Sequence, residues 1–134
     1  MTRTEKAIEL RKKGFNCAQA VALSFCEDLN LDREIVSKGM EGFGGGMGGY
    51  NLTCGALSAA VYIAGIINSD GSLTAPSSKR DTYAICKNIC ESFKEECGSH
   101  FCGEIKGLSS GTPLKSCDEC IACGVKLAEK ALKD

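Results

Sequence analysis

The hydrophobic residues of this chain recur with the period of an α-helix. Residues 17–29 show the pattern clearly, since their apolar side chains form one stripe, made of Ala18, Val21, Ala22, Phe25 and Leu29. No segment has the strict alternation of apolar and polar residues that is typical of a half-buried strand. The pattern therefore predicts an all-α fold.

Capping residues and glycines mark the ends of the predicted helices. Three N-caps and two capping boxes can be recognised, namely Asn16, Asp32, Thr53, Thr2–Glu5 and Ser116–Glu119. The expected helices run up to Gly14, from Cys17 to about Leu29, from Asp32 to about Gly42, from Cys54 to about Asn68, from Pro76 to about Cys97, and from Cys117 to the end of the chain. Residues 98–115 are expected to be irregular. These elements predict one domain, residues 1–134, folded as a compact bundle of about five to six helices.

The most apolar of these helices, residues 54–68, has no charged residue and is expected to be the buried central helix. A glycine-rich stretch, residues 42–49, precedes it and should form a compact loop, because so flexible a backbone suits neither helix nor strand. This loop either packs closely against neighbouring helices or lets backbone approach a cofactor or substrate beside Cys54. The candidate cofactor-binding glycines are Gly44, Gly45, Gly46, Gly48, Gly49 and Gly55.

Ten cysteines in 134 residues far exceed ordinary usage, yet fall short of a secreted disulfide scaffold. Residues 1–13 lack the pattern of a secretory signal, and the longest apolar run has 14 residues, too few for a membrane span. We therefore expect a cytoplasmic protein whose reduced thiols serve metal binding or redox chemistry. The formal net charge of −1 supports neither nucleic-acid nor membrane binding.

Three cysteines, Cys17, Cys54 and Cys117, directly follow a predicted N-cap and should lie in the first turn of a helix. The free backbone N–H groups of that turn stabilise an anion and lower the pKa of a thiol. Because the thiolate is both the nucleophile and the metal ligand, these positions favour catalytic or metal-binding cysteines. Cys17 and Cys54 are the candidate catalytic residues.

The last predicted helix begins with a C-x-x-C-x-x-C run, Cys117, Cys120 and Cys123. This run has three of the four ligand positions of the bacterial ferredoxin motif, and no cysteine follows to supply the fourth. A C-x-x-C pair is also a dithiol–disulfide motif or half of a zinc site. These signals make Cys17, Cys54, Cys117, Cys120 and Cys123 candidate metal ligands, to which the family resemblance described below adds Cys102, and the metal itself stays open.

Three further cysteines fit the hydrophobic core better than a reactive site, whereas for Cys97 both interpretations stay open. Cys86 and Cys90 share the apolar face of the predicted helix that ends at Cys97, and Cys26 falls in another apolar stretch. His100, the only histidine, stands between Cys97 and Cys102. It either completes a zinc site with them or is an ordinary surface or packing residue.

Three segments together resemble the C_GCAxxG_C_C family, whose members are assigned a redox role from their cysteines. Phe15–Val21 is similar to the opening of the family pattern, and Gly44–Gly49 with Cys54–Ala59 is similar to its central motif. The likeness spans about residues 8–132. It implies that the later family cysteines correspond to Cys102 and to one of the last three, for which Cys120 is favoured. Ala59 stands where the motif has its final glycine, and the chain has cysteines beyond the family's four.

The leading hypothesis is therefore a redox protein in which Cys17, Cys54, Cys102 and Cys120 converge on one site. The cysteines serve either as ligands of an iron–sulfur cluster or other metal that transfers electrons, or as a thiol–disulfide pair. A redox partner protein is expected in both cases. The alternative is a non-catalytic helical interaction module stabilised by zinc or disulfides. Substrate, oligomeric state and cysteine connectivity stay open.

Overall fold

The structure, a computed structural model, describes residues 1–133. Within this range the chain forms eight α-helices and one π-helical turn, and no strand. The helices are α1 (Arg3–Lys12), α2 (Cys17–Leu23), α3 (Cys26–Leu29), α4 (Arg33–Glu41), α5 (Gly55–Asn68), α6 (Lys79–Cys97), α7 (Cys102–Lys106) and α8 (Cys117–Lys133), and the π-helical turn is Gly46–Tyr50. The all-α prediction is confirmed.

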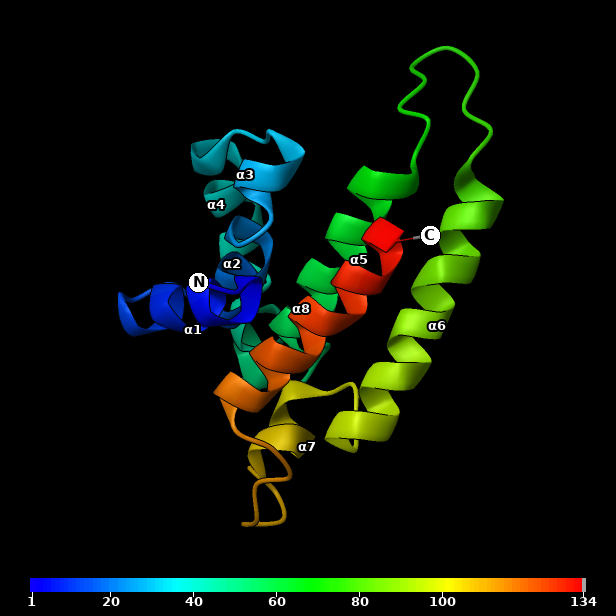
Figure 1. The fold of residues 1–134 in the computed structure, drawn as a ribbon. Coiled ribbons are helices and arrows are strands. Elements are labelled where there is room, and N and C mark those ends of the chain that lie inside the picture. The colour runs from blue at the N-terminus through cyan, green and yellow to red at the C-terminus, as the bar shows by residue number, and fades with distance from the viewer. Residues whose placement is uncertain (134) are drawn as a thin grey trace.

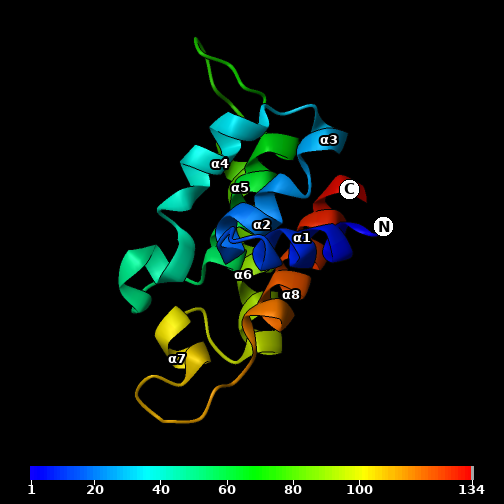
Figure 2. The same ribbon diagram turned by 90° about the vertical axis from the view of Figure 1, so that its left-hand side faces the viewer.

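Helix α5 is the centre of the bundle. It packs against α2, α6 and α8, and in Figure 1 α5, α6 and α8 run side by side. The side chains of Leu57 and Ile63 are 1% and 0% exposed, as expected for a helix without charged residues. Helix α1 packs across α2 and α8, as the turned view also shows (Figure 2). The predicted buried central helix is confirmed.

The prediction of about five to six helices is too low, for two reasons. Residues 17–29 form two helices because the Ser24 hydroxyl donates a hydrogen bond of 2.6 Å to the Val21 carbonyl, and the backbone turns more tightly there. Residues 98–115, which were expected to be irregular, contain the short helix α7. Its five residues are fewer than helical periodicity can reveal in a sequence.

The glycine-rich stretch forms the predicted compact loop. The π-helical turn at its end is irregular, because Met47 and Gly48 have positive φ values of 65° and 85°. Gly45 and Gly46 have positive φ values of 59° and 57°. A Cβ atom added to Gly44 would lie 2.3 Å from the Asn16 Cγ, and one added to Gly46 would lie 2.5 Å from the Cys102 Cβ. These contacts favour close packing as the role of Gly44 and Gly46, because a side chain at either position would overlap its neighbour.

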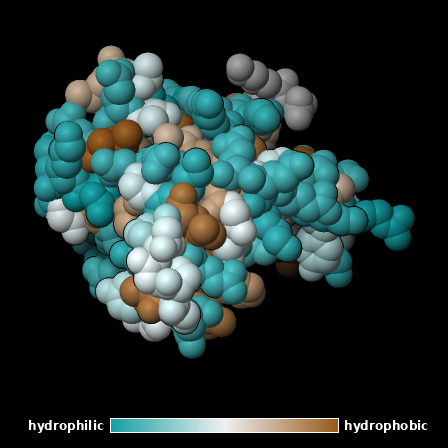
Figure 3. Space-filling model, turned by 90° about the horizontal axis from the view of Figure 1, so that it is seen from below, coloured by the Kyte–Doolittle hydropathy of each residue, from teal (hydrophilic) through white to brown (hydrophobic). Residues whose placement is uncertain are grey.

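The surface seen from below is mostly hydrophilic, with hydrophobic atoms in small separate patches (Figure 3). None of the helices in residues 1–133 combines the length and the hydrophobicity that a membrane span requires.

Candidate functional site

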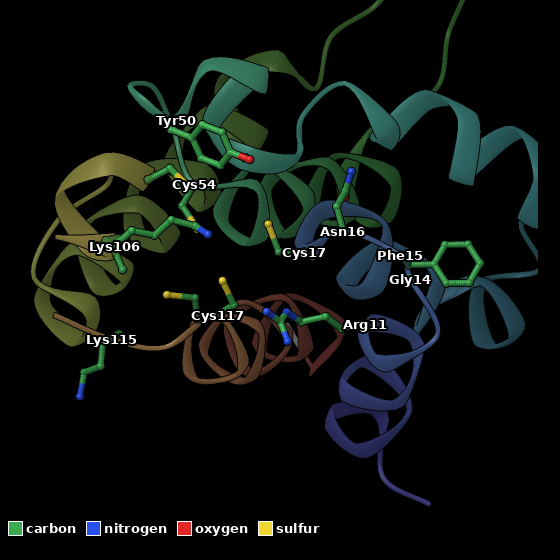
Figure 4. A pocket seen from close by; sticks show the side chains of 14 residues that line it. Arg11, Gly14, Phe15, Asn16, Cys17, Tyr50, Cys54, Lys106, Lys115 and Cys117 are labelled. Atoms are coloured by element: carbon green, nitrogen blue, oxygen red, sulfur yellow. The ribbon is translucent and has the colours of Figure 1, made fainter. Parts of the chain in front are cut away.

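Five of the ten cysteines line one cavity of about 360 Å³ (Figure 4). They are Cys17, Cys54, Cys102, Cys117 and Cys120. The first residues of α2, α7 and α8 are Cys17, Cys102 and Cys117, and Cys54 is the N-cap of α5. Four helices therefore begin at this cavity with a cysteine, and the helix N-termini give its wall a partial positive charge.

The start of α2 is held by its predicted N-cap. The Asn16 side chain accepts a hydrogen bond of 2.9 Å from the Gln19 N–H, and the Gln19 side chain accepts one of 3.0 Å from the Asn16 N–H. Asn16 also donates to the Glu41 carbonyl at 2.9 Å, which ties this cap to the end of α4. Cys17 is thus held at a rigid point of the cavity wall.

A short backbone pairing brings Cys54 and Cys102 to the same cavity. The Cys54 N–H donates to the His100 carbonyl at 2.7 Å, and the Cys102 N–H donates to the Leu52 carbonyl at 2.9 Å. Thr53 and Phe101 form the antiparallel bridge between these bonds. The prediction that Thr53 caps this helix is wrong, because Cys54 itself occupies the N-cap position.

The cysteine run of α8 is divided between two sides of the helix. Ser116 and Glu119 form the predicted capping box, with bonds of 3.1 and 3.0 Å. Residues three positions apart are turned by about 60° around a helix with 3.6 residues per turn. Cys117 and Cys120 therefore reach the cavity, whereas Cys123 lies away from it, in contact with Cys97.

Cys54 is the centre of a thiol network. Cys120 and Cys17 donate hydrogen bonds to its sulfur, and the N–H groups of Ala56 and Leu57 in the first turn of α5 do so as well. These four bonds outweigh burial and hold the pKa of Cys54 well below that of an ordinary thiol. The hydrogen bond to Cys54 and burial raise the pKa of Cys17, and bonds to Cys54 and Cys97 raise that of Cys120. Cys54 is therefore the thiolate of the cavity, and Cys17 beside it keeps its proton. Outside the cavity, hydrogen bonds from Cys120 and Cys123 lower the pKa of Cys97 as well.

The lowered pKa predicts that alkylation of Cys54 by iodoacetamide depends little on pH. Because Cys54 stays deprotonated, we expect its rate to change less than about threefold between pH 5.5 and 8, whereas an ordinary thiol accelerates by roughly 200-fold over this range. Cys86, whose pKa is raised by burial, is the internal control. Mass spectrometry can follow both, because each is the only cysteine of its tryptic peptide, residues 39–79 and 81–87. A rate at Cys54 that rises tenfold per pH unit would contradict this assignment.

Cations surround the cysteines of the cavity. Arg11, Lys106 and Lys115 line it, and no carboxylate does among the described residues. Arg11 lies 3.5 Å from Asp118 and Lys115 lies 3.8 Å from Glu119, in exposed pairs that add little stability. The Lys106 ammonium lies 5.5 Å from the centre of the Tyr50 ring. The lining therefore suits an anionic occupant.

Among the glycines predicted to bind a cofactor, Gly45 is the one that lines the cavity, and its N–H donates to the Cys17 sulfur. A Cβ on Gly55 would lie 2.7 Å from that same sulfur, so Gly55 allows α5 to approach Cys17. Gly44 and Gly46 pack against Asn16 and Cys102, as described above. Gly48 faces open space, and a Cβ on Gly49 would approach only the Asn51 side chain.

Other predicted residues lie outside the cavity. Cys26 is buried in the core, and Cys86 and Cys90 pack against it. The His100 ring contacts the Cys90 carbonyl at 3.1 Å. In residues 1–133 no three side chains of His, Cys, Asp or Glu are grouped so that they could hold a metal ion as they stand.

The fold and the cavity define a small helical protein with a cysteine-lined site. A family model described as "Putative redox-active protein (C_GCAxxG_C_C)" matches residues 15–131, and the chain belongs to this family. An Archaeoglobus fulgidus protein named only as uncharacterized is 30% identical over 148 aligned positions, which cover 100% of this chain and 98% of the relative. No solved structure matches the chain. The resemblance found in the sequence is thus confirmed, and the description of the family supports a redox role.

Proposed function

We propose that the protein carries out thiol–disulfide exchange, with Cys54 as the attacking thiolate and Cys17 as the resolving cysteine. The observation that supports this most is the position of the Cys54 sulfur at the N-terminus of α5. There it accepts hydrogen bonds from two thiols and two backbone N–H groups on the wall of an accessible cavity. A thiolate held in this way is poised to react with a disulfide.

The reaction proceeds in two exchanges. The Cys54 thiolate attacks one sulfur of a substrate disulfide, so a mixed disulfide with Cys54 forms and the first substrate thiolate leaves. Cys17 then loses its proton and attacks the Cys54 sulfur, which releases the second substrate thiolate and forms a Cys17–Cys54 disulfide. The substrate gains two electrons, and the two cysteines lose them. Arg11 and Lys106 stabilise the departing thiolates and favour substrates with negative charge, whereas the Lys115 side chain points away from the cysteines (Figure 4).

A second candidate function follows from the donor set of the same cavity. An anionic iron–sulfur cluster would suit this lining. The lining combines soft thiolate ligands with N–H groups and cations, and none of its described residues is a carboxylate. Cys17, Cys54, Cys102 and either Cys117 or Cys120 would hold it, and the cluster would supply one-electron transfer. Small movements of these side chains would be needed, since no three of the described residues are grouped for one metal ion as they stand.

One experiment on protein purified without oxygen separates the two candidates. Metal, labile sulfide and the visible spectrum are measured first. The reduced protein is then treated with a small anionic disulfide and its cysteine pairs are mapped. We expect colourless protein with little metal and a Cys17–Cys54 disulfide. Iron with sulfide and a brown colour would overturn the exchange proposal in favour of the cluster, and tightly bound zinc without exchange would support a structural role.

A further inference from the structure

We propose that Cys97 and Cys123 form a second redox pair, which exchanges disulfides with the cavity through Cys120. This inference rests on the proposed thiol–disulfide function. It concerns two cysteines that do not line the cavity.

The evidence is a continuous line of thiol contacts across the bundle. Cys120, in the first turn of α8, lines the cavity together with Cys54. Cys123 lies three residues further along α8, on the neighbouring part of the helix surface. Cys97, the last residue of α6, lines a hollow together with Cys123 and is close to both Cys120 and Cys123. The packing of α5, α6 and α8 therefore brings each thiol near the next possible exchange partner.

Cysteines that only fill the core behave differently in the same molecule. The Cys26 thiol donates to the Ala22 carbonyl at 3.6 Å, and the Cys86 thiol donates to the Val61 carbonyl at 3.9 Å. These are ordinary contacts of a small buried side chain. The side chains of Cys97, Cys120 and Cys123 are nearly as buried as that of Cys26, with exposures of 2, 3 and 4%, but their neighbours include other thiols.

The second pair also has its own opening. Cys97 and Cys123 line a separate hollow together with charged residues of α6 and α8 and of the segment before α8, namely Glu96, Lys115, Glu119 and Lys126. Neither cysteine lines the cavity that contains Cys17 and Cys54. The two pairs of cysteines therefore line two neighbouring hollows, which share Lys115.

The transfer consists of three balanced exchanges. Once the Cys17–Cys54 disulfide has formed, the Cys120 thiolate attacks the Cys54 sulfur and releases Cys17. The Cys97 thiolate then attacks the Cys120 sulfur and releases Cys54. Finally the Cys123 thiolate attacks the Cys97 sulfur and releases Cys120. Each attacking thiol loses a proton and each released thiolate gains one. The net result is a Cys97–Cys123 disulfide and reduced Cys17 and Cys54, so two electrons have moved between the pairs.

The test is a time course of disulfide mapping on the fully reduced full-length chain. Half an equivalent of a small anionic disulfide is added, samples are quenched with acid and alkylated, and the disulfide-linked peptides are quantified. In the wild type we expect the Cys17–Cys54 disulfide to appear first and to decline as the Cys97–Cys123 disulfide grows. In Cys120→Ser we expect the first disulfide to persist and the second to form at least about tenfold more slowly, because the intermediate thiol is missing.

Cys90→Ser, on the same helix as Cys97 but outside the line of thiols, is the matched control and should follow the wild-type time course. Circular dichroism shows whether Cys120→Ser keeps its helices. If the variant does not fold, the wild-type time course still tests whether the Cys17–Cys54 disulfide precedes the Cys97–Cys123 disulfide. A Cys17–Cys54 disulfide that persists in the wild type would overturn the proposed transfer to Cys97 and Cys123 but not the proposed thiol–disulfide function. A Cys97–Cys123 disulfide that forms equally fast in Cys120→Ser would overturn it too. If no Cys17–Cys54 disulfide forms in either protein, the proposed function itself fails.

Discussion

Replacing Cys54 with serine is expected to reduce the rate of disulfide exchange by about a hundredfold or more, because a serine hydroxyl without an adjacent base does not attack sulfur. The other thiols of the cavity should react more slowly, since they lack the two backbone N–H groups of α5 that help to hold the Cys54 sulfur as a thiolate. The rate is measured as the release of a chromophoric thiolate from an aromatic disulfide with carboxylate groups.

The fold should survive this substitution. Serine has nearly the shape of cysteine, and α5 keeps its apolar contacts with α2, α6 and α8. Helical content by circular dichroism should therefore match that of the wild type. Cys90→Ser, which removes a half-buried thiol of α6 away from the cavity, should retain the wild-type rate. Equal rates for Cys54→Ser and Cys90→Ser would mean that Cys54 is not the nucleophile.

Replacing Gly46 with alanine is expected to lower the free energy of unfolding by about 3 kcal/mol, from left-handed backbone strain and overpacking together. Gly46 has a φ of 57°, and an added Cβ would lie 2.5 Å from the Cys102 Cβ and 2.9 Å from the Leu52 carbonyl oxygen. Backbone cannot move aside as a flexible side chain can. For a chain of this length the loss corresponds to a drop in Tm of roughly 10 °C, measured by thermal unfolding.

Gly39→Ala is the matched control for this prediction. Gly39 lies inside α4, and a Cβ there would meet no atom within 4 Å. Alanine should therefore raise the stability by about 0.5–1 kcal/mol, because glycine loses more backbone entropy in a helix. If both substitutions had the same effect, the contact between the glycine loop and Cys102 would not contribute to the fold.

Local signals explain which parts of the fold could be predicted. The capping boxes at Thr2 and Ser116 and the N-caps at Asn16 and Asp32 are formed as expected, because a cap needs only residues within one turn. The break after Leu23 was missed, since it depends on one serine hydroxyl that bonds to the backbone instead of solvent. Helix α7 was missed because five residues show no period.

The candidate site, too, could be predicted only where neighbouring residues carry the signal. Such residues indicate that Cys17 and Cys117 begin helices and that a helix starts beside Cys54. Cys102 had no such signal and was found through the family pattern alone. It reaches the cavity because the bridge between Thr53 and Phe101 joins segments that are 48 positions apart in the chain. The cations Arg11, Lys106 and Lys115 were not predicted either, because nothing near them in the sequence relates them to a cysteine.

By itself, the sequence determined an all-α protein of the C_GCAxxG_C_C family, with its chemistry in the cysteines and reactive positions at helix starts. These properties depend on periodicity and on contacts within a single turn. Only the tertiary structure decided which cysteines meet, since all ten have the same side chain and their spacing does not specify contacts between helices. The packing of α8 against α5 and α6 brings Cys120 between Cys54 and Cys97 and separates Cys123 from Cys117.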